Sequence, residues 1–408
     1  MHLRTTRTVR NLTTGLLALA LFTPSTGCGL IQLAVNAAKK NTVNMDKWQV
    51  KKISLGLREQ TSICPRRSVQ LAVFAEADHK KRKNKSKKLE TWSGDESKSR
   101  IGKMGFEEFE FTIGGGQLDP KTGMFVPNPD VLATAASGFT IAAKYKRDAK
   151  VDPAKVDYAP SYDCITFAGG SGPSGPMGES GPSGNSGAAG AGGDSSKAGG
   201  DGGSGTGGGV AGNGGDGGAG PNIVAYATVV KTPHHDHLVL LQVTGDVNDT
   251  VLFDPKAPIV LSARGGSGGS GGTGGAGGSG GAGGSGYPGG KGGVGGPGGQ
   301  GGNGANGGAG GSIRLVYDAA FPELATVITL DASGGDAGMA GAPGPGGYAG
   351  SAGSALGEGA TAGTAGTAGS DGTGGMPGQP GPDGRASAEA GDVSAQFATL
   401  PEGITRVG

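Results

Sequence analysis

The chain has 408 residues, of which 91 are glycine, and only 34% are hydrophobic and 5% aromatic. This composition excludes one large conventional core, so conventional cores must occupy only part of the chain. The formal net charge is +1. Residues 29–168 hold 24 Lys and Arg against 16 Asp and Glu, a net charge of +8, whereas residues 169–408 hold 8 against 18, a net charge of −10. This asymmetry indicates polyanion contact through the first part.

Residues 1–28 predict an export signal. Arg4, Arg7 and Arg10 form a charged start, and the apolar run at residues 15–22 is too short to span a bilayer. The signal ends at Cys28 in the sequence Ser-Thr-Gly-Cys. We therefore expect residues 1–28 to direct the chain out of the cytoplasm.

The end of this segment resembles a bacterial lipoprotein signal, in which the cysteine is lipidated and becomes the new N-terminus. Ser25 stands where such signals usually have leucine. The resemblance implies a lipid on Cys28, and Gly29 in place of aspartate favours the outer membrane and cell surface. The alternative is an ordinary secretory signal that is cut nearby.

Three cysteines cannot all pair within one exported chain, so one of them needs another role. If Cys28 carries lipid, Cys64 and Cys164 remain as one pair at the two ends of the first folded region. We expect a disulfide between them, which closes a loop of about 100 residues and contributes roughly 3–5 kcal/mol in the chain-entropy model. The alternative is two unpaired, buried thiols.

After a tether at residues 29–47, residues 48–168 are typical of antiparallel strands. Apolar runs at residues 69–75, 106–113 and 139–145 are separated by turn signals rich in Gly, Pro, Asn and Asp. This spacing predicts a small β-sandwich, and we expect it to be immunoglobulin-like.

The strongest charged feature of this region is a basic cluster. It comprises Lys80, Lys81, Arg82, Lys83, Lys85, Lys87 and Lys88. We expect a loop between two strands that binds acidic polymers such as lipopolysaccharide, acidic polysaccharide or extracellular DNA. The alternative is a solvated loop that only adds solubility.

Three glycine-triplet blocks occupy most of the second half. They span residues 169–222, 265–312 and 335–386, and in the second block every third residue is glycine and is nearly always followed by another. The first block opens with collagen-like Gly-Pro triplets. Apolar, β-branched segments at 223–264 and 313–334 lie between the blocks, and residues 387–408 form a C-terminal segment. The blocks are therefore excursions from one β-framework.

A period of three matches the polyproline-II helix, and glycine permits neighbouring backbones to approach closely. We expect the blocks to be of polyglycine-II type, and the second block to fold back as several short antiparallel rods with turns at Tyr287-Pro288 and Ala305-Asn306. A collagen triple helix, which requires three chains and abundant proline, is the alternative.

The chain places a GGX block between two strands, after a lipoprotein signal. This organisation resembles the glycine-rich or collagen-like surface lipoproteins of bacteria. The GGX register alone is similar to the snow flea antifreeze protein and to the glycine-rich tips of phage adhesins. These resemblances imply a surface location and hydrogen-bonded glycine helices.

The sequence contains no set of nucleophile, base and orienting group, and its glycine-rich stretches lack the ending of a phosphate loop. His234, His235 and His237 are close in sequence, but we expect a polar hairpin turn there and no metal or other cofactor.

We thus expect a non-enzymatic, lipid-anchored surface protein with a structural or adhesive function. Its expected partners are the membrane, acidic surface polymers and further copies of itself, without a specific small-molecule substrate. The alternatives are a polyanion-binding module and an ice-binding protein.

Overall fold

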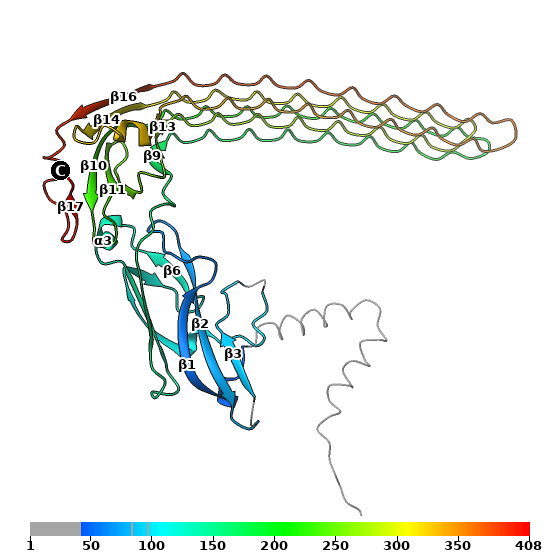
Figure 1. Ribbon diagram of the computed structural model, residues 1–408. Coiled ribbons are helices and arrows are strands. Elements are labelled where there is room, and N and C mark those ends of the chain that lie inside the picture. The colour runs from blue at the N-terminus through cyan, green and yellow to red at the C-terminus, as the bar shows by residue number, and fades with distance from the viewer. Residues whose placement is uncertain (1–41, 83–84, 96–97) are drawn as a thin grey trace, which may run out of the picture. The chain divides into compact units, whose positions relative to one another are not determined.

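The computed structural model describes residues 42–82, 85–95 and 98–408 (Figure 1). Strands hold 31% of the chain and helices 4%, so the expected mainly β class is confirmed. The chain divides into two compact units, residues 1–164 and 165–408. Cys28, Lys83 and most of the expected tether lie outside the described residues.

Unit 1 contains a five-stranded and a three-stranded antiparallel sheet. The larger sheet consists of β1 (Trp48–Leu57), β2 (Val69–His79), β3 (Ser86–Glu90), β5 (Gly116–Leu118) and β6 (Met124–Pro127). The smaller sheet consists of β4 (Phe109–Gly114), β7 (Phe139–Tyr145) and β8 (Ala154–Tyr158). Short helical turns are η1 (Met45–Lys47), η2 (Phe106–Glu108) and α3 (Val131–Ala135).

The two sheets of unit 1 pack against each other through two hydrophobic clusters. One hydrophobic cluster joins Val73 of β2 to Phe109 of β4, and a second joins Phe125 of β6 to Phe139 of β7. The rings of Phe125 and Phe139 meet edge to face at 5.7 Å, a preferred aromatic geometry. Alternation along the strands thus buries one face of each sheet.

The strands expected at residues 69–75 and 139–145 are present as β2 and β7. The strand expected at 106–113 begins only at Phe109, because residues 106–108 form a 3-10 turn. That turn buries Phe106, whose ring lies over Gly123, where an added Cβ would clash with it. The fold also begins before Trp48, since Met45 is buried and the Val43 N–H donates to the Lys103 carbonyl.

The expected disulfide is present between Cys64 and Cys164, with 6.3 Å between the Cα atoms. Cys64 lies in the connection between β1 and β2, and Cys164 is the last residue of unit 1. The bridge therefore ties the start of the larger sheet to the end of the unit.

Replacing both cysteines by alanine should lower the unfolding free energy of unit 1 by about 4–5 kcal/mol, because the bridge closes a loop of about 100 residues in the unfolded chain. Urea denaturation followed by tryptophan fluorescence measures this, since Trp48 and Trp92 both lie in unit 1. An unchanged midpoint in the double variant, or two reactive thiols in the unreduced protein, would contradict the prediction.

Unit 2 is built on two sheets that each contain three parallel strands. In one sheet β13 (Ile259–Arg264) lies between β9 (Phe167–Ser171) and β15 (Ile328–Asp331). In the other, β14 (Ser312–Asp318) lies between β10 (Asn222–Lys231) and β16 (Arg385–Gly391). The second sheet is extended by β11 (Leu238–Gly245), β12 (Asp249–Phe253) and β17 (Thr405–Arg406), and α4 (Leu324–Val327) precedes β15.

Six extended segments connect these two sheets in pairs, and we call them rods 1 to 6. Their residues are 172–193, 199–221, 265–286, 289–311, 332–354 and 361–384. Rods 1, 3 and 5 leave the sheet of β9, β13 and β15, and rods 2, 4 and 6 return to the sheet of β10, β14 and β16. Figure 1 shows the rods running side by side and turning back at their far end.

Hydrogen bonds between rods recur at every third residue. Within the layer of rods 1, 3 and 5, the Gly172 N–H donates to the Arg264 carbonyl at 2.8 Å, and the same step repeats up to Gly193. Rod 3 donates likewise to rod 5, and in the second layer rod 2 donates to rod 4 and rod 4 to rod 6. Between the layers, each of rods 2 to 6 donates to the rod before it in the chain.

The number of neighbours differs among the rods and matches their composition. Rods 3 and 4 bond to four other rods, and both are GGX sequences; rods 1 and 6 bond to two, and usually have one glycine per triplet. The prolines at 173, 176 and 182 in rod 1 offer only carbonyls, which accept from rod 2. Proline has no N–H, so it fits where only the carbonyl is used.

Each glycine block contains one turn and two long rods, so the expectation of several short rods in the second block is wrong. The turn at Tyr287-Pro288 is confirmed, and its peptide bond is cis. The turn expected at Ala305-Asn306 is wrong: Ala305 lies within rod 4, and its N–H donates to the Gly269 carbonyl at 2.9 Å. Rod 4 does not turn there, because its hydrogen bonds to the neighbouring rods continue past Ala305 up to the start of β14.

Rod 6 offers a matched test of this packing. A Cβ on Gly372 would lie 2.0 Å from the Gly299 carbonyl oxygen, whereas a Cβ on Gly374 would make only ordinary contacts at 3.7 Å. We expect Gly372→Ala to destabilise the rods by at least about 1–3 kcal/mol, the cost of overpacking, and Gly374→Ala to be nearly neutral. Amide hydrogen exchange over residues 289–311 and 361–384 measures this; equal protection in the two variants would contradict the packing.

Candidate polyanion-binding site

The basic cluster lies on a β-hairpin of unit 1. β2 and β3 pair antiparallel, with Asp78 opposite Ser86, and residues 80–85 form the connection. The Lys85 N–H donates to the Arg82 carbonyl, and the His79 N–H donates to that of Lys85 at 2.9 Å. The His79 ring packs edge to face on Trp48 at 5.2 Å. The hairpin therefore has a fixed base that presents the cluster to solvent.

The structure brings only part of the cluster together. Lys80, Lys81, Arg82 and Lys85 are exposed at the hairpin tip, and none of these described residues has a carboxylate partner. Lys83 lies outside the described residues. The tip is thus a small surface of uncompensated positive charge, which suits a flexible polyanion.

Lys87 and Lys88 point to opposite faces of β3, because side chains alternate along a strand. Lys88 lies opposite Glu76 in the pairing of β3 with β2. The Lys87 ammonium instead lies beside Gly102, 3.6 Å from where a Cβ would stand. Lys88 therefore does not belong to the tip, and Lys87 adds its charge to a second site.

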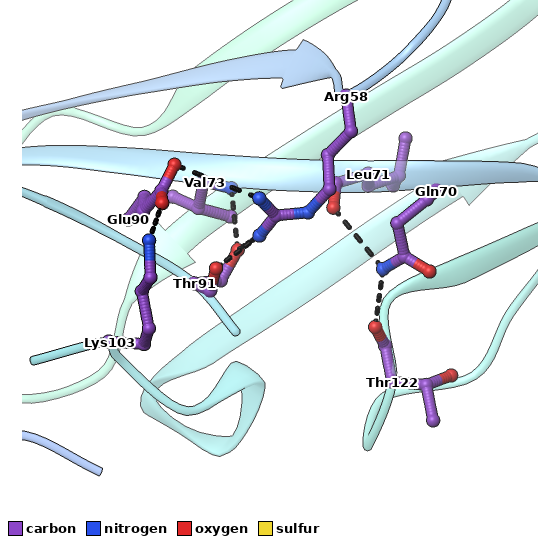
Figure 2. Close-up of polar contacts among 8 residues, drawn as sticks. All are labelled: Arg58, Gln70, Leu71, Val73, Glu90, Thr91, Lys103 and Thr122. Atoms are coloured by element: carbon purple, nitrogen blue, oxygen red, sulfur yellow. Dashed lines mark hydrogen bonds and ion pairs between the residues drawn. The ribbon is translucent and has the colours of Figure 1, made fainter. Parts of the chain in front are cut away.

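That second site is a polar cluster around Arg58, which sequence reasoning missed (Figure 2). The Arg58 guanidinium donates to the Thr91 carbonyl and lies 3.7 Å from a Glu90 carboxylate oxygen. The other Glu90 oxygen pairs with the Lys103 ammonium. Residues 58, 90, 91 and 103 share no motif spacing, so only the strand pairing brings them together.

The ionisation of this cluster reflects burial and crowding of positive charge. Burial lowers the pKa of Arg58, against the opposing effect of the Glu59 carboxylate. Burial also lowers the pKa of Lys103, and the neighbouring charges of Arg58 and Lys87 lower it further. The cations Arg58, Lys87 and Lys103 thus lie close together, and the carboxylates of Glu59 and Glu90 offset part of their charge.

The histidine group forms part of the connection between β10 and β11. The backbone N–H groups of His234 and His235 donate to the Thr232 hydroxyl at 3.3 and 3.1 Å. Burial, and then the charge of His234, lowers the pKa of His235. The expected hairpin turn is present, and within residues 42–82, 85–95 and 98–408 no group of three or more His, Cys, Asp or Glu could hold a metal ion.

The outer faces of the rods carry the third residue of each triplet. Side chains of one rod bond to the free N–H groups of the next: Asp201 accepts from the Lys291 N–H at 2.7 Å, and Asn303 accepts from the Met376 N–H at 2.8 Å. On rod 6, exposed Thr and Ser residues recur every third position from Thr361 to Thr373. The rods thus present faces of small residues.

Comparisons with protein-family models, with curated proteins and with solved structures gave no match. Among the helices of the described residues, none has the length and apolar character that crossing a membrane requires.

Replacing Lys80, Lys81, Arg82 and Lys85 by glutamine should weaken binding to single-stranded DNA and lower its salt dependence. For four lost contacts, the slope of log affinity against log salt should fall by about 3, at about 0.7 per charge. Elution from heparin resin should also shift to lower salt.

The matched control replaces Lys144, Lys146, Lys150 and Lys155 by glutamine, because these residues are exposed in the same unit and belong to β7, to β8 and to the connection between them. It changes the net charge equally. Equal losses of affinity in both variants would show that net charge alone, and not the hairpin tip, determines binding.

Proposed function

We propose that this chain is an exported, lipid-anchored surface protein with a structural or adhesive function, without enzymatic activity. The observation that carries the proposal is the bundle of six rods, in which N–H groups at every third residue bond to neighbouring rods of the same chain. Such a bundle is an ordered extension of the β-framework, because a flexible linker would not form this regular pattern of hydrogen bonds.

We further propose that the rods are polyglycine-II helices. The support is the period of three in both the sequence and the hydrogen bonds. At about 3.1 Å per residue, rods of this length would reach roughly 70 Å. The Gly-Pro triplets that suggested collagen belong to rod 1, whose partners are rods 2 and 3 of the same chain. A bundle formed by one chain would serve as a spacer and as a broad surface for weak, repeated contacts.

We also propose that unit 1 is an immunoglobulin-like domain at the membrane-proximal end. Its two antiparallel sheets, which pack through two hydrophobic clusters, support this proposal. The disulfide, which joins a loop to the end of the unit, differs from a bridge between two central strands.

A second candidate function is binding of acidic surface polymers, and the exposed hairpin tip favours it. Ice binding has one supporting feature, the column of Thr and Ser on rod 6. Rod 4 beside it carries Lys291, Val294 and Pro297 at the corresponding positions, so the face does not repeat one residue type. We therefore place ice binding behind both other functions; measurable thermal hysteresis would reverse that order.

The lipid anchor has a direct test. Cells that express the chain should incorporate an alkyne-labelled fatty acid into it, and Cys28→Ala should abolish the label because no thiol remains at the modification site. Cys64→Ala is the control and should retain the label. Undiminished labelling of the Cys28→Ala chain would contradict the anchor.

The structural or adhesive function is tested in the producing cells. Deleting the gene should reduce cohesion or surface attachment, and the wild-type chain should restore it. Complementation by Gly374→Ala should succeed and by Gly372→Ala should fail, because only the latter disturbs rod packing. Normal attachment without the gene would overturn the proposed function.

A further inference from the structure

The layer of rods 1, 3 and 5 has an outer face that we call face A. In rod 3, a Cβ on Gly265 would meet rod 4 and a Cβ on Gly266 would meet rod 1, so the third residue of the triplet, such as Ser267, points away from both. The positions of face A are therefore every third residue of 171–192, 264–285 and 333–354. Three positions that the hydrogen bonds join across the layer form one rung.

Face A carries almost no charge. Its residues are mainly serine, threonine and alanine, and its two charged residues, Arg264 and Asp336, pair with each other at 2.8 Å near the base. The outer face of rods 2, 4 and 6 differs, because it carries Asp201 and Lys291, and the Asp201 carboxylate bonds to the backbone of the next rod. An uncharged surface can lose its water at low cost, which suits a protein interface.

Three large side chains stand on face A. They are Tyr348, Met177 and Met339, which are 81%, 77% and 72% exposed, the highest values among the large hydrophobic residues of the described chain. Met177 and Met339 share a rung, since the Gly178 N–H donates to the Ser270 carbonyl and the Gly271 N–H to that of Met339. Exposed hydrophobic residues that gather on one surface mark an interaction site.

The positions of Met339 and Tyr348 match a two-fold axis. Rod 5 contributes eight positions to face A, and Met339 is the third from the base, whereas Tyr348 is the third from the far end. A second copy that is turned end for end, with rod 5 on rod 5, therefore places Met339 of each copy on Tyr348 of the other. Methionine sulfur and an aromatic ring make favourable contacts, and a two-fold axis forms each contact twice.

The charged pair at the base selects this orientation over the parallel one. If two copies pointed in the same direction, rod 3 would face rod 3 and Arg264 would lie on Arg264 of the other copy, an unfavourable meeting of like charges. End for end, the rung of Arg264 meets the rung of Ser285 at the far end, which has no charge.

The area of face A is sufficient for a stable pair. At about 3.1 Å per residue and about 5 Å between rods, the face measures roughly 70 by 15 Å, or about 1,000 Å². Standard interfaces bury about 800 Å² on each partner. One face of one bundle is thus large enough without help from unit 1.

We propose that face A binds face A of a second copy of this chain, with the two bundles antiparallel. Met339 of each copy packs on Tyr348 of the other, and the small residues around them allow close contact. The inference deepens the proposed structural function and rests on it for its role in cells, where antiparallel pairing joins copies that are anchored on opposite surfaces. The pairing itself is tested on the purified chain, so it can fail without the cellular function and the reverse.

The first experiment is sedimentation of the full chain with Cys28→Ala, which removes the lipid. This chain should form a reversible dimer at about micromolar concentrations. Met339→Glu should raise the dissociation constant more than about tenfold, because two unpaired carboxylates would be buried in each dimer. The matched control is Met376→Glu, since Met376 is 69% exposed on the outer face of rod 6 and should leave the dimer unchanged.

A charge exchange tests the orientation. Tyr348→Lys alone should also weaken the dimer, whereas Met339→Glu and Tyr348→Lys together should restore it, because opposite charges then meet across the axis. The two positions are nine residues apart on rod 5, roughly 28 Å at 3.1 Å per residue, so they cannot compensate within one copy.

Several results would overturn the proposal. A chain that stays monomeric up to high concentration has no such interface, and equal weakening by Met339→Glu and Met376→Glu would show that face A is not the contact. Restoration of Met339→Glu by Met177→Lys, and not by Tyr348→Lys, would show parallel pairing and contradict the antiparallel arrangement. Circular dichroism checks that each variant keeps its rods, which is expected because the changed side chains are exposed.

Discussion

The structure of unit 2 depends on how closely two backbones can approach each other. At most of the inward positions of the rods, a Cβ would stand near 2 Å from a carbonyl oxygen of the next rod. A side chain seldom fits in that space, so glycine occupies nearly every position at which a rod faces a neighbour. Ala211 and Ala305 are exceptions, because each donates its N–H to a neighbouring rod as the glycines do. The same approach allows the N–H groups to bond directly across the gap, which satisfies the backbone where no sheet or helix does so.

This constraint explains the composition of each rod from its place in the bundle. Rods 3 and 4 lie at the centre, and two of three positions face other rods, which requires the GGX sequence. Rods 1 and 6 lie at the edges, where one position in three is inward and proline, threonine and methionine are accepted elsewhere. A collagen-like sequence and a glycine-glycine sequence are therefore two parts of one packing scheme.

The sheets at the base determine which triplet lies beside which. Asn222 of β10 pairs with Ser312 of β14, a separation of 90 residues, and the same separation joins Asp201 to Lys291 near the far end of rods 2 and 4. Ser312 pairs with Arg385 in the sheet, a separation of 73 residues that recurs between Asn303 and Met376. The register of the parallel strands is thus carried along the rods without a break. Ladder bonds in the sheets and rod bonds stabilise each other, which offsets part of the entropy that glycine loses on ordering.

The sequence by itself determined which segments are extended, because alternation along strands such as β2 and β7 and the period of three in the blocks are local patterns. It also determined the cysteine pair, because few pairings are possible among three cysteines.

The sequence did not determine the number of turns in each block: Ala305 and Asn306 break the GG pattern as visibly as Tyr287 and Pro288 do, yet only the latter form a turn. The Arg58 cluster was likewise not readable, since its residues are brought together by strand pairing. Tertiary structure decided both, because a rod continues or turns according to the neighbours that its N–H groups find, and a polar cluster forms where distant segments meet. Neither the neighbours of a rod nor the meeting of distant segments can be predicted from the local order of residues.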